Sequence, residues 1–240
     1  MSIVDKEYIR KFICSNDGSP VTYRWSHGAT ETHLGDGILI YSIIQMMRYK
    51  NLLCIGSGGG FIPRIMTQAR IDLHDQGIFE GDRDYNWGDI GTTFLVDAAN
   101  EVGGQVDYLD KDSFLRSTFF PRFIKETSEN AYYNFFVKQD IKLDFIHLDG
   151  DHSYDGVKKD FDLYSKILAP NGMISLHDTD KEYSDNLLIS EDTKHTFAPF
   201  DGPSKLIKEL GPEWKTFNFF NHNTVKDKPS STGITLIQRA

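Results

Sequence analysis

Residues 143–180, LDFIHLDGDHSYDGVKKDFDLYSKILAPNGMISLHDTD, decide the fold. An apolar run, Phe145–Leu148, leads into acidic and histidine residues, and a helical pattern follows from about Tyr154 to Leu168. The tripeptide Pro170–Gly172 predicts a turn, and a second apolar run, Met173–Leu176, also ends in acidic and histidine residues. A crossover of this length joins neighbouring parallel strands. We therefore expect both polar clusters at one edge of a parallel sheet, where open α/β folds bind ligands.

The composition excludes several classes of protein. Of the 240 residues, 39% are hydrophobic and 25% are charged, which is typical of a globular domain with a buried core. A formal charge of −9 argues against binding to nucleic acid or to an anionic membrane. Two cysteines do not make a disulfide framework, the N-terminus lacks the apolar region of a signal peptide, and no run approaches the roughly 20 apolar residues of a spanning helix. We expect a cytoplasmic protein without a nucleic-acid or membrane partner.

A glycine-rich turn predicts a nucleotide-binding unit. The apolar run Asn51–Ile55 predicts a short buried strand, Gly56–Gly60 (GSGGG) follows it directly, and residues 61–70 are a helix candidate. Glycines let the backbone pass close to a ligand, and the free amides of a helix N-terminus point into the same space. A glycine run placed between a strand and a helix therefore favours a bound nucleotide.

Carboxylates follow the next expected strands. Asp97 ends the strand candidate Thr92–Val96, where it could accept hydrogen bonds from both ribose hydroxyls of a nucleotide or cap a helix. After a third strand candidate, Gln105–Tyr108, Asp112 and Ser113 could meet an adenine edge, although Asp112 would look the same as a helix cap. We expect Asp97 to bind ribose.

The remaining pattern predicts further helices and a final hairpin. Residues 214–220 and 233–239 alternate as strands do, and the polar connection between them leaves no room for a crossover helix, so they should pair antiparallel. Helices are expected at residues 3–13, 35–48 and 203–210 and, in two pieces broken near Pro121 and Thr127–Asn130, over 114–139.

The chain divides into an N-terminal part and one large domain. Residues 1–34 have no clear period and could form a packed arm or a lid, and 35–240 form a single domain with insertions near 72–91 and 181–201. Exposed aromatic side chains within 114–136 could make a homo-oligomer interface.

Several motifs together resemble those of a known family. LLCIGSGGG, FLVD, LDGDHSYDG, LAPNGMISLHD and the final hairpin resemble a class I S-adenosylmethionine-dependent methyltransferase, and the third and fourth motifs are similar to metal-dependent sugar and catechol-type O-methyltransferases. The resemblance covers about residues 35–240. It implies an α/β fold: a Rossmann-like, doubly wound, seven-stranded sheet, mostly parallel with an antiparallel last strand. It also implies S-adenosylmethionine bound by Gly56, Ser57, Gly58, Gly60, Asp97, Asp112, Ser113 and Asp149.

Two positions depart from the family pattern. The family often has an acidic residue two places before the first glycine, where this chain has Cys54. His177 stands where metal-dependent relatives often carry a second acid. The first change removes a carboxylate contact to the cofactor, and the second changes the ligands offered to a metal.

The two polar clusters suggest metal-assisted chemistry. Asp149 and Asp178 end adjacent expected strands, which lie roughly 4.8 Å apart. Carboxylates crowded at one edge repel each other unless a cation intervenes. We hypothesise Mg²⁺ or Mn²⁺ held by Asp149, Asp178 and His177, where it would lower the pKa of a substrate hydroxyl. Asp151 or His152 would then accept the proton before methyl transfer.

Other interpretations remain open. Asp151 or Ser153 could cap the following helix, and the histidines could be structural. The leading hypothesis is an S-adenosylmethionine-dependent O-methyltransferase acting on a small hydroxylated molecule, such as a sugar or a natural-product intermediate. The alternatives are an NAD(P)-dependent dehydrogenase with the same glycine turn, which the final hairpin disfavours, and a noncatalytic nucleotide-binding relative. His27 and His33 lie in the N-terminal part and could reach substrate.

Overall fold

A computed structural model describes most of the chain. The described residues are 5–16, 19–21, 24–78, 91–98, 121–180, 201–219 and 232–240. The third strand candidate at 105–108, Asp112, Ser113 and most of both predicted insertions lie outside them. Among the helices of the described part, none is both long and apolar enough to cross a membrane.

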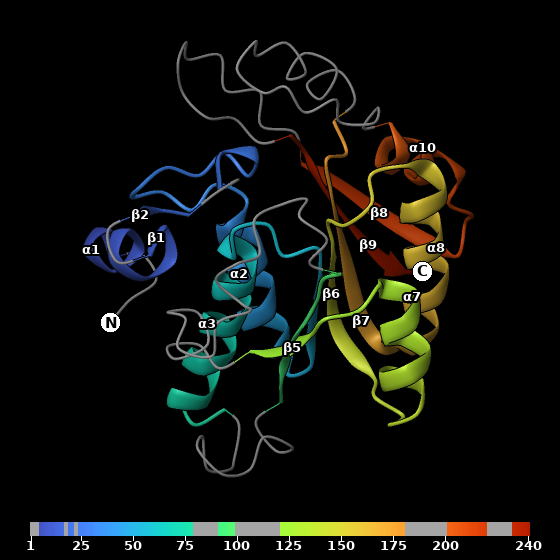
Figure 1. Cartoon of the computed structure of the whole chain (residues 1–240), viewed down its shortest axis with the longest axis horizontal. Helices are drawn as coiled ribbons and strands as arrows, with labels where there is room; N and C mark the ends of the chain where they lie inside the picture. The colour runs from blue at the N-terminus through green and yellow to red at the C-terminus, as the bar shows by residue number, and fades with distance from the viewer. Residues whose placement is uncertain are drawn as a thin grey trace.

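Within the described residues, seven strands form one mixed sheet in the order β5-β4-β3-β6-β7-β9-β8 (Figure 1). The first five in this order pair parallel, and the last strand of the chain, β9, runs antiparallel to both of its neighbours. This confirms the predicted α/β sheet and its antiparallel last strand. The strands are β3 (Leu52–Ile55), β4 (Thr93–Val96), β5 (Arg122–Ile124), β6 (Leu143–Leu148), β7 (Leu168–His177), β8 (Trp214–Phe219) and β9 (Ile234–Arg239).

Helices cover both faces of the sheet (Figure 1). Successive residues of a strand point to opposite faces, so Leu52 and Cys54 join one apolar core while Leu53 and Ile55 join the other. The first core lies under α2 (Gly37–Met47) and α3 (Phe61–Asp75), and the second under α7 (Ser128–Ala131), η3 (Tyr132–Val137), α8 (Tyr154–Tyr164), η4 (Ser165–Ile167) and α10 (Gly202–Glu209).

The N-terminal segment packs on α3. It contains α1 (Lys6–Tyr8), η1 (Ile9–Ile13), the short strands β1 (Ser15–Asn16) and β2 (Ser19–Pro20), and η2 (Arg24–Ser26). The buried guanidinium of Arg64 on α3 donates a hydrogen bond of 3.0 Å to Ser15 O, and Tyr8 Oη donates to Gln68 Oε1. These polar contacts hold the segment against the domain.

The edge strand β5 corrects one expectation. We expected residues 114–139 to be helical in two pieces. Residues 128–137 are helical and 114–120 lie outside the described residues, but Arg122–Ile124 pair parallel with β4. Thr127 does not break a helix; it caps one, because its Oγ1 accepts a hydrogen bond of 3.3 Å from Asn130 N. A short apolar run cannot be assigned to helix or strand by periodicity alone, and here pairing with β4 decided the outcome.

The predicted turn at Pro170–Gly172 lies inside β7. Leu168 pairs with Leu143 and Met173 with Phe145, which is five steps along β7 but only two along β6. The register shift means that extra residues of β7 bulge out of the ladder, so the predicted turn lies within a strand that starts earlier than we placed it.

Helix α3 also runs further than predicted. Residues 72–75, which we assigned to the first insertion, form its last turn. The polar side chain of Asp72 accepts hydrogen bonds from Tyr41 Oη on α2 at 2.6 Å and from Gln68 Nε2 at 2.7 Å. Asp72 therefore joins α3 to α2. The sequence pattern alone does not indicate this contact.

The turn after β3 brings two strand ends into close contact. Gly56 has a φ of 76°, and a Cβ added to it would lie 2.0 Å from the carbonyl oxygen of Asp149, which follows β6. Asp149 N in turn donates a hydrogen bond of 2.9 Å to Ile55 O. Only glycine fits at position 56, and the glycine loop is thereby fixed beside the end of β6.

We predict that Gly56→Ala destabilises the protein much more than Gly77→Ala. Both glycines have positive φ, 76° and 71°, so a side chain costs about 1–2 kcal/mol at either position. At Gly77 no described atom would lie within 4 Å of the new Cβ, whereas at Gly56 the Asp149 backbone must move. Urea unfolding should show a loss of about 1 kcal/mol for G77A and at least about 3 kcal/mol for G56A. Equal losses would contradict the close approach.

Candidate functional site

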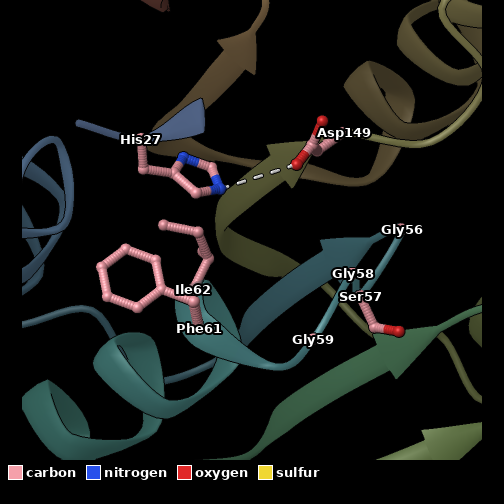
Figure 2. Close-up of a pocket in the computed structure, with 8 residues that line it drawn as sticks. All are labelled: His27, Gly56, Ser57, Gly58, Gly59, Phe61, Ile62 and Asp149. Atoms are coloured by element: carbon pink, nitrogen blue, oxygen red, sulfur yellow. Dashed lines mark ion pairs between the residues drawn. The ribbon is translucent and has the colours of Figure 1, made fainter. Parts of the chain in front are cut away.

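A hollow opens between the glycine loop, the end of β6 and the N-terminal segment. Figure 2 shows Gly56, Ser57, Gly58 and Gly59 along one side and His27 on the other, with its imidazole directed toward Asp149. Phe61 and Ile62 from the first turn of α3 complete the lining. Of the predicted cofactor residues, four line this hollow: Gly56, Ser57, Gly58 and Asp149. Gly60 is the N-cap of α3.

Asp97 lies directly after β4 and contacts the glycine loop. Its Oδ2 accepts a hydrogen bond from Ser57 N at 3.1 Å and another from Ser57 Oγ. The carboxylate therefore stands beside the loop and holds it in place, and its expected contact with ribose stays a prediction. Asp112 and Ser113 lie outside the described residues, so their predicted contact with adenine stays a prediction.

The two predicted carboxylates lie together at the sheet edge. Asp149 and Asp178 follow the paired strands β6 and β7, and His152 Nε2 lies 3.1 Å from Asp149 Oδ1 and 3.0 Å from Asp178 Oδ2. One ligand atom from each of the three residues lies within 4.8 Å of the others. The side chains are largely buried, at 20% exposed for Asp149 and 9% for Asp178. Asp149, Asp178 and His152 are therefore a group of possible metal ligands, two carboxylates and one imidazole, which we call the donor set.

His177 lies beside the same carboxylates. Its Nδ1 is 3.2 Å from Asp149 Oδ1 and 3.4 Å from Asp178 Oδ1, and its Nε2 is 3.1 Å from the hydroxyl of Thr232. The compact donor set thus contains His152, whereas the sequence had suggested His177 as the third ligand. His177 instead joins the two carboxylates to the start of the hairpin strand β9.

The charges at this edge compensate each other. Burial acts to lower the pKa of His152, but Asp178 and Asp149 raise it to about 10. The same carboxylates overcome burial at His177 and raise its pKa to about 9. Burial acts to raise the pKa of Asp178, yet His177 and His152 hold it at about 2, and the pKa of Asp149 also lies well below its usual range. The carboxylates therefore favour the charged form of both imidazoles, and the imidazoles favour the charged form of both carboxylates.

Asp178 also has an unusual backbone conformation. Its φ is 55°, in the left-handed region that few residues other than glycine adopt. Backbone strain of this kind persists only where surrounding contacts fix it, and it is concentrated at functional sites. Here the imidazoles of His152 and His177 hold the side chain.

The other candidate base, Asp151, faces the helix. Its Oδ1 accepts a hydrogen bond of 2.9 Å from Ser153 N, and its side chain covers Gly156, where a Cβ would lie 2.3 Å away. Ser153 is the N-cap of α8. Of the two candidate bases, His152 is the one that contacts both carboxylates.

Two further histidines and Cys54 surround Asp149. His27 Nε2 and His147 Nε2 each lie 3.9 Å from Asp149 Oδ2. His147 is buried inside β6 and pairs through Nδ1 with Ser175 Oγ at 2.8 Å, as expected of a packing residue. The Cys54 thiol donates to Gly56 O at 3.2 Å, and burial raises its pKa well above the usual value. Cys54 thus supports the loop as a neutral group.

His27 is the site residue that the sequence indicated least clearly. It lies in a part of the chain with no strong period, 122 residues before Asp149. Two contacts fix its segment: Asp36 N donates to His27 O at 2.8 Å, and Thr232 N donates to Ser26 O at 2.9 Å. The only sequence signal was an imidazole in a candidate lid.

The carboxyl group of Asp160 is buried close to Gly150, in the loop that follows β6. A Cβ on Gly150 would lie 3.6 Å from Asp160 Oδ2, and Ser128 Oγ donates a hydrogen bond to Asp160 Oδ1. Burial raises the pKa of Asp160 to about 6, the hydrogen bond from Ser128 opposes this shift, and the charge of Asp151 adds to it. Asp160 therefore ties α7 to α8 directly under the site.

The strand order and the glycine turn define a class I methyltransferase fold, and comparisons with known proteins agree. The sequence matches the profile of a family described as a methyltransferase domain over residues 53–179, which is 127 of the 240 residues. The chain belongs to this methyltransferase-domain family. A comparison with curated proteins gives no match.

Solved structures show the same fold. An O-methyltransferase from Bacillus cereus in complex with S-adenosylhomocysteine is 16% identical, with a TM-score of 0.59 over 90% of this chain and 84% of that one. TomG, an O-methyltransferase from Streptomyces achromogenes involved in tomaymycin synthesis and bound to S-adenosylmethionine, is 12% identical, with a TM-score of 0.58 over 85% and 79%. At these identities the likeness concerns the fold, and it confirms the predicted fold class.

We predict that Asp160→Asn stabilises the protein near neutral pH and not at pH 4. Because the folded pKa of about 6 exceeds the unfolded value of 3.8, folding favours the protonated form, and stability is lost as pH rises from about 4 through 6. The amide of the variant keeps an acceptor for Ser128 and carries no charge. Urea unfolding should show D160N gaining about 2–3 kcal/mol on the wild type between pH 4 and pH 7.

The matched control is Asp162→Asn, which removes an exposed carboxylate from the same helix. That residue pairs with Lys158 across one helical turn, so we expect a change below about 1 kcal/mol. A difference between D160N and wild type that stays constant from pH 4 to pH 7 would contradict the assignment.

Proposed function

We propose that this protein is an S-adenosylmethionine-dependent O-methyltransferase that transfers a methyl group to a hydroxyl of a small molecule, assisted by a divalent metal. The observation that carries the proposal is the position of Asp149. It lines the hollow beside the glycine loop and, with Asp178 and His152, forms the donor set at the end of β6 and β7. A methyl donor and a hydroxyl acceptor would thus meet at one residue.

The glycine loop suits the methyl donor. Its backbone carries no Cβ at Gly56, Gly58 or Gly59, so a ligand can lie directly against the chain. Asp97, after β4, is placed to hold a ribose while it supports Ser57. Both solved structures named above contain S-adenosylmethionine or its demethylated product, which supports the same ligand here.

The donor set suits a divalent cation. Carboxylate oxygens are the ligands that suit Mg²⁺ and Mn²⁺, and Asp149 and Asp178 offer them side by side. When bound between Asp149 and Asp178, such a cation would act as a Lewis acid that lowers the pKa of a substrate hydroxyl. Asp149 and Asp178 would orient the substrate hydroxyl toward the hollow in which the methyl donor would lie.

His152 is the group that we propose to accept the hydroxyl proton. Its pKa is raised by the charges of Asp178 and Asp149. Once those charges are neutralised by a cation, burial favours the uncharged imidazole, which is the form that can take a proton. Asp151 remains the alternative base, although it is engaged at the start of α8.

Two other functions were open at the level of sequence. Membership of the methyltransferase-domain family sets aside a dehydrogenase. A noncatalytic relative would keep the fold and lose the ligand, so ligand binding separates it from the enzyme. A small-molecule substrate belongs to the same proposal and is supported by the charge of −9, which disfavours polyanionic partners. A cytoplasmic location is also part of the proposal.

We predict that S-adenosylhomocysteine stabilises the protein against heat and that NAD does not. A ligand at 100 times its dissociation constant adds about 2.7 kcal/mol, which corresponds to a rise in Tm of about 5–10 °C for a chain of this length. Differential scanning fluorimetry with each ligand measures this directly. Stabilisation by NAD alone would overturn the proposed cofactor, and no stabilisation by either would favour the noncatalytic relative.

We also predict that Asp149→Asn and Asp178→Asn each weaken Mn²⁺ binding by at least about tenfold, because each removes one ligand. Titration of free Mn²⁺ by electron paramagnetic resonance gives the affinity without need of a substrate. Asp162→Asn, an exposed carboxylate on α8, is the control and should bind as the wild type does. Unchanged affinity in both D149N and D178N would rule out this metal site.

A further inference from the structure

A second group of metal-ligating side chains lies behind the donor set. It consists of His27 from the N-terminal segment, Asp36 at the start of α2, and His177 at the end of β7. One ligand atom from each lies within 4.8 Å of the others. The three residues belong to three parts of the chain that are separated in sequence, so the fold alone brings them together.

One nitrogen in this group is buried without a partner. His27 is 4% exposed, and its Nδ1 has no hydrogen-bond partner among the described residues. An unsatisfied buried polar atom costs about 1–3 kcal/mol, so such an atom in a folded protein calls for a ligand. Asp36, at the N-cap position of α2, brings a carboxylate to the same group.

Asp149 lies beside both imidazoles of the group and is hydrogen-bonded to that of His177. Its Oδ1 lies 3.2 Å from His177 Nδ1, and its Oδ2 lies 3.9 Å from His27 Nε2, as Figure 2 shows for the second pair. The ring nitrogens that are not directed at Asp149 are therefore His27 Nδ1 and His177 Nε2. A carboxylate behind an imidazole, with the metal on the other nitrogen, is the usual arrangement around histidine ligands.

The rings of the two histidines pack against each other. Their centroids are 4.0 Å apart at an interplanar angle of 34°. Both imidazoles therefore present a nitrogen to the same small region as the carboxylate of Asp36.

Ligation by His177 would require the loss of one proton and one hydrogen bond. Its Nε2 now lies 3.1 Å from the Thr232 hydroxyl, which also donates to Ser26 O at 3.1 Å. The hydroxyl keeps its bond to Ser26 if His177 turns its nitrogen to a cation.

We propose that His27, Asp36 and His177 form a second cation site, separate from the Asp149–His152–Asp178 set, that takes a transition metal of the Zn²⁺ type. Two imidazoles and one carboxylate are the ligands that Zn²⁺ prefers, whereas Mg²⁺ prefers oxygen alone. The bound ion would join the N-terminal segment and the start of α2 to the end of β7. Since His27 lines the hollow, the ion would fix one wall of it.

The experiment is a Zn²⁺ titration of the full-length, metal-stripped protein in competition with a chromophoric chelator. His27→Gln and Asp36→Asn remove one ligand each and should weaken Zn²⁺ binding by at least about tenfold. His74→Gln, a histidine beside Asp75 on α3, should bind Zn²⁺ as the wild type does. Mn²⁺ titration of H27Q and D36N checks that both variants keep their fold and the other site.

The outcomes separate the two sites. Weakened Zn²⁺ binding in H27Q and D36N with unchanged Mn²⁺ binding supports the second site, whether or not the protein transfers methyl groups. Zn²⁺ affinity unchanged in both variants overturns it. Should H27Q not fold, the isosteric D36N decides alone.

Discussion

The close contact between the ends of β3 and β6 is the constraint on which the site depends. Asp149 N donates to Ile55 O, and the Asp149 carbonyl lies so near Gly56 that no side chain fits there. Parallel pairing of β6 with β7 then sets Asp178 beside Asp149. One backbone contact therefore places the glycine loop, the hollow and both carboxylates within a single region. A shift of one residue in the β3–β6 register would separate them all.

Burying two carboxylates side by side requires compensating charge. The protein supplies it with imidazoles from two directions, His152 from the loop before α8 and His177 from the end of β7. The same compensation explains how the site could accept a metal, since a cation can take over the attraction that the imidazolium groups provide. The strained backbone of Asp178 is held by these contacts as well.

The sequence predicted those parts of the fold in which local pattern and tertiary role coincide. Apolar strands followed by glycine or aspartate, and the hairpin at the C-terminal end, were placed within a few residues of where they occur. The errors arose where a tertiary contact overrode the pattern. Pairing with β4 turned residues 122–124 into a strand, and a bulge moved the start of β7 to Leu168. No local signal distinguishes these outcomes.

For the site, the sequence identified Asp149, Asp178 and His152 as neighbours because each follows the end of one of two adjacent strands. It could not identify the pairing of His27 and Asp36 with His177, because that grouping depends on how the N-terminal segment folds back over the sheet. The family match covers residues 53–179 and so contains the glycine loop and both carboxylates. His27 and Thr232 lie outside that region. The region that matches the family therefore contains the glycine loop and the two carboxylates of the candidate site. The segments outside that region, which include His27 and Thr232, enclose the site.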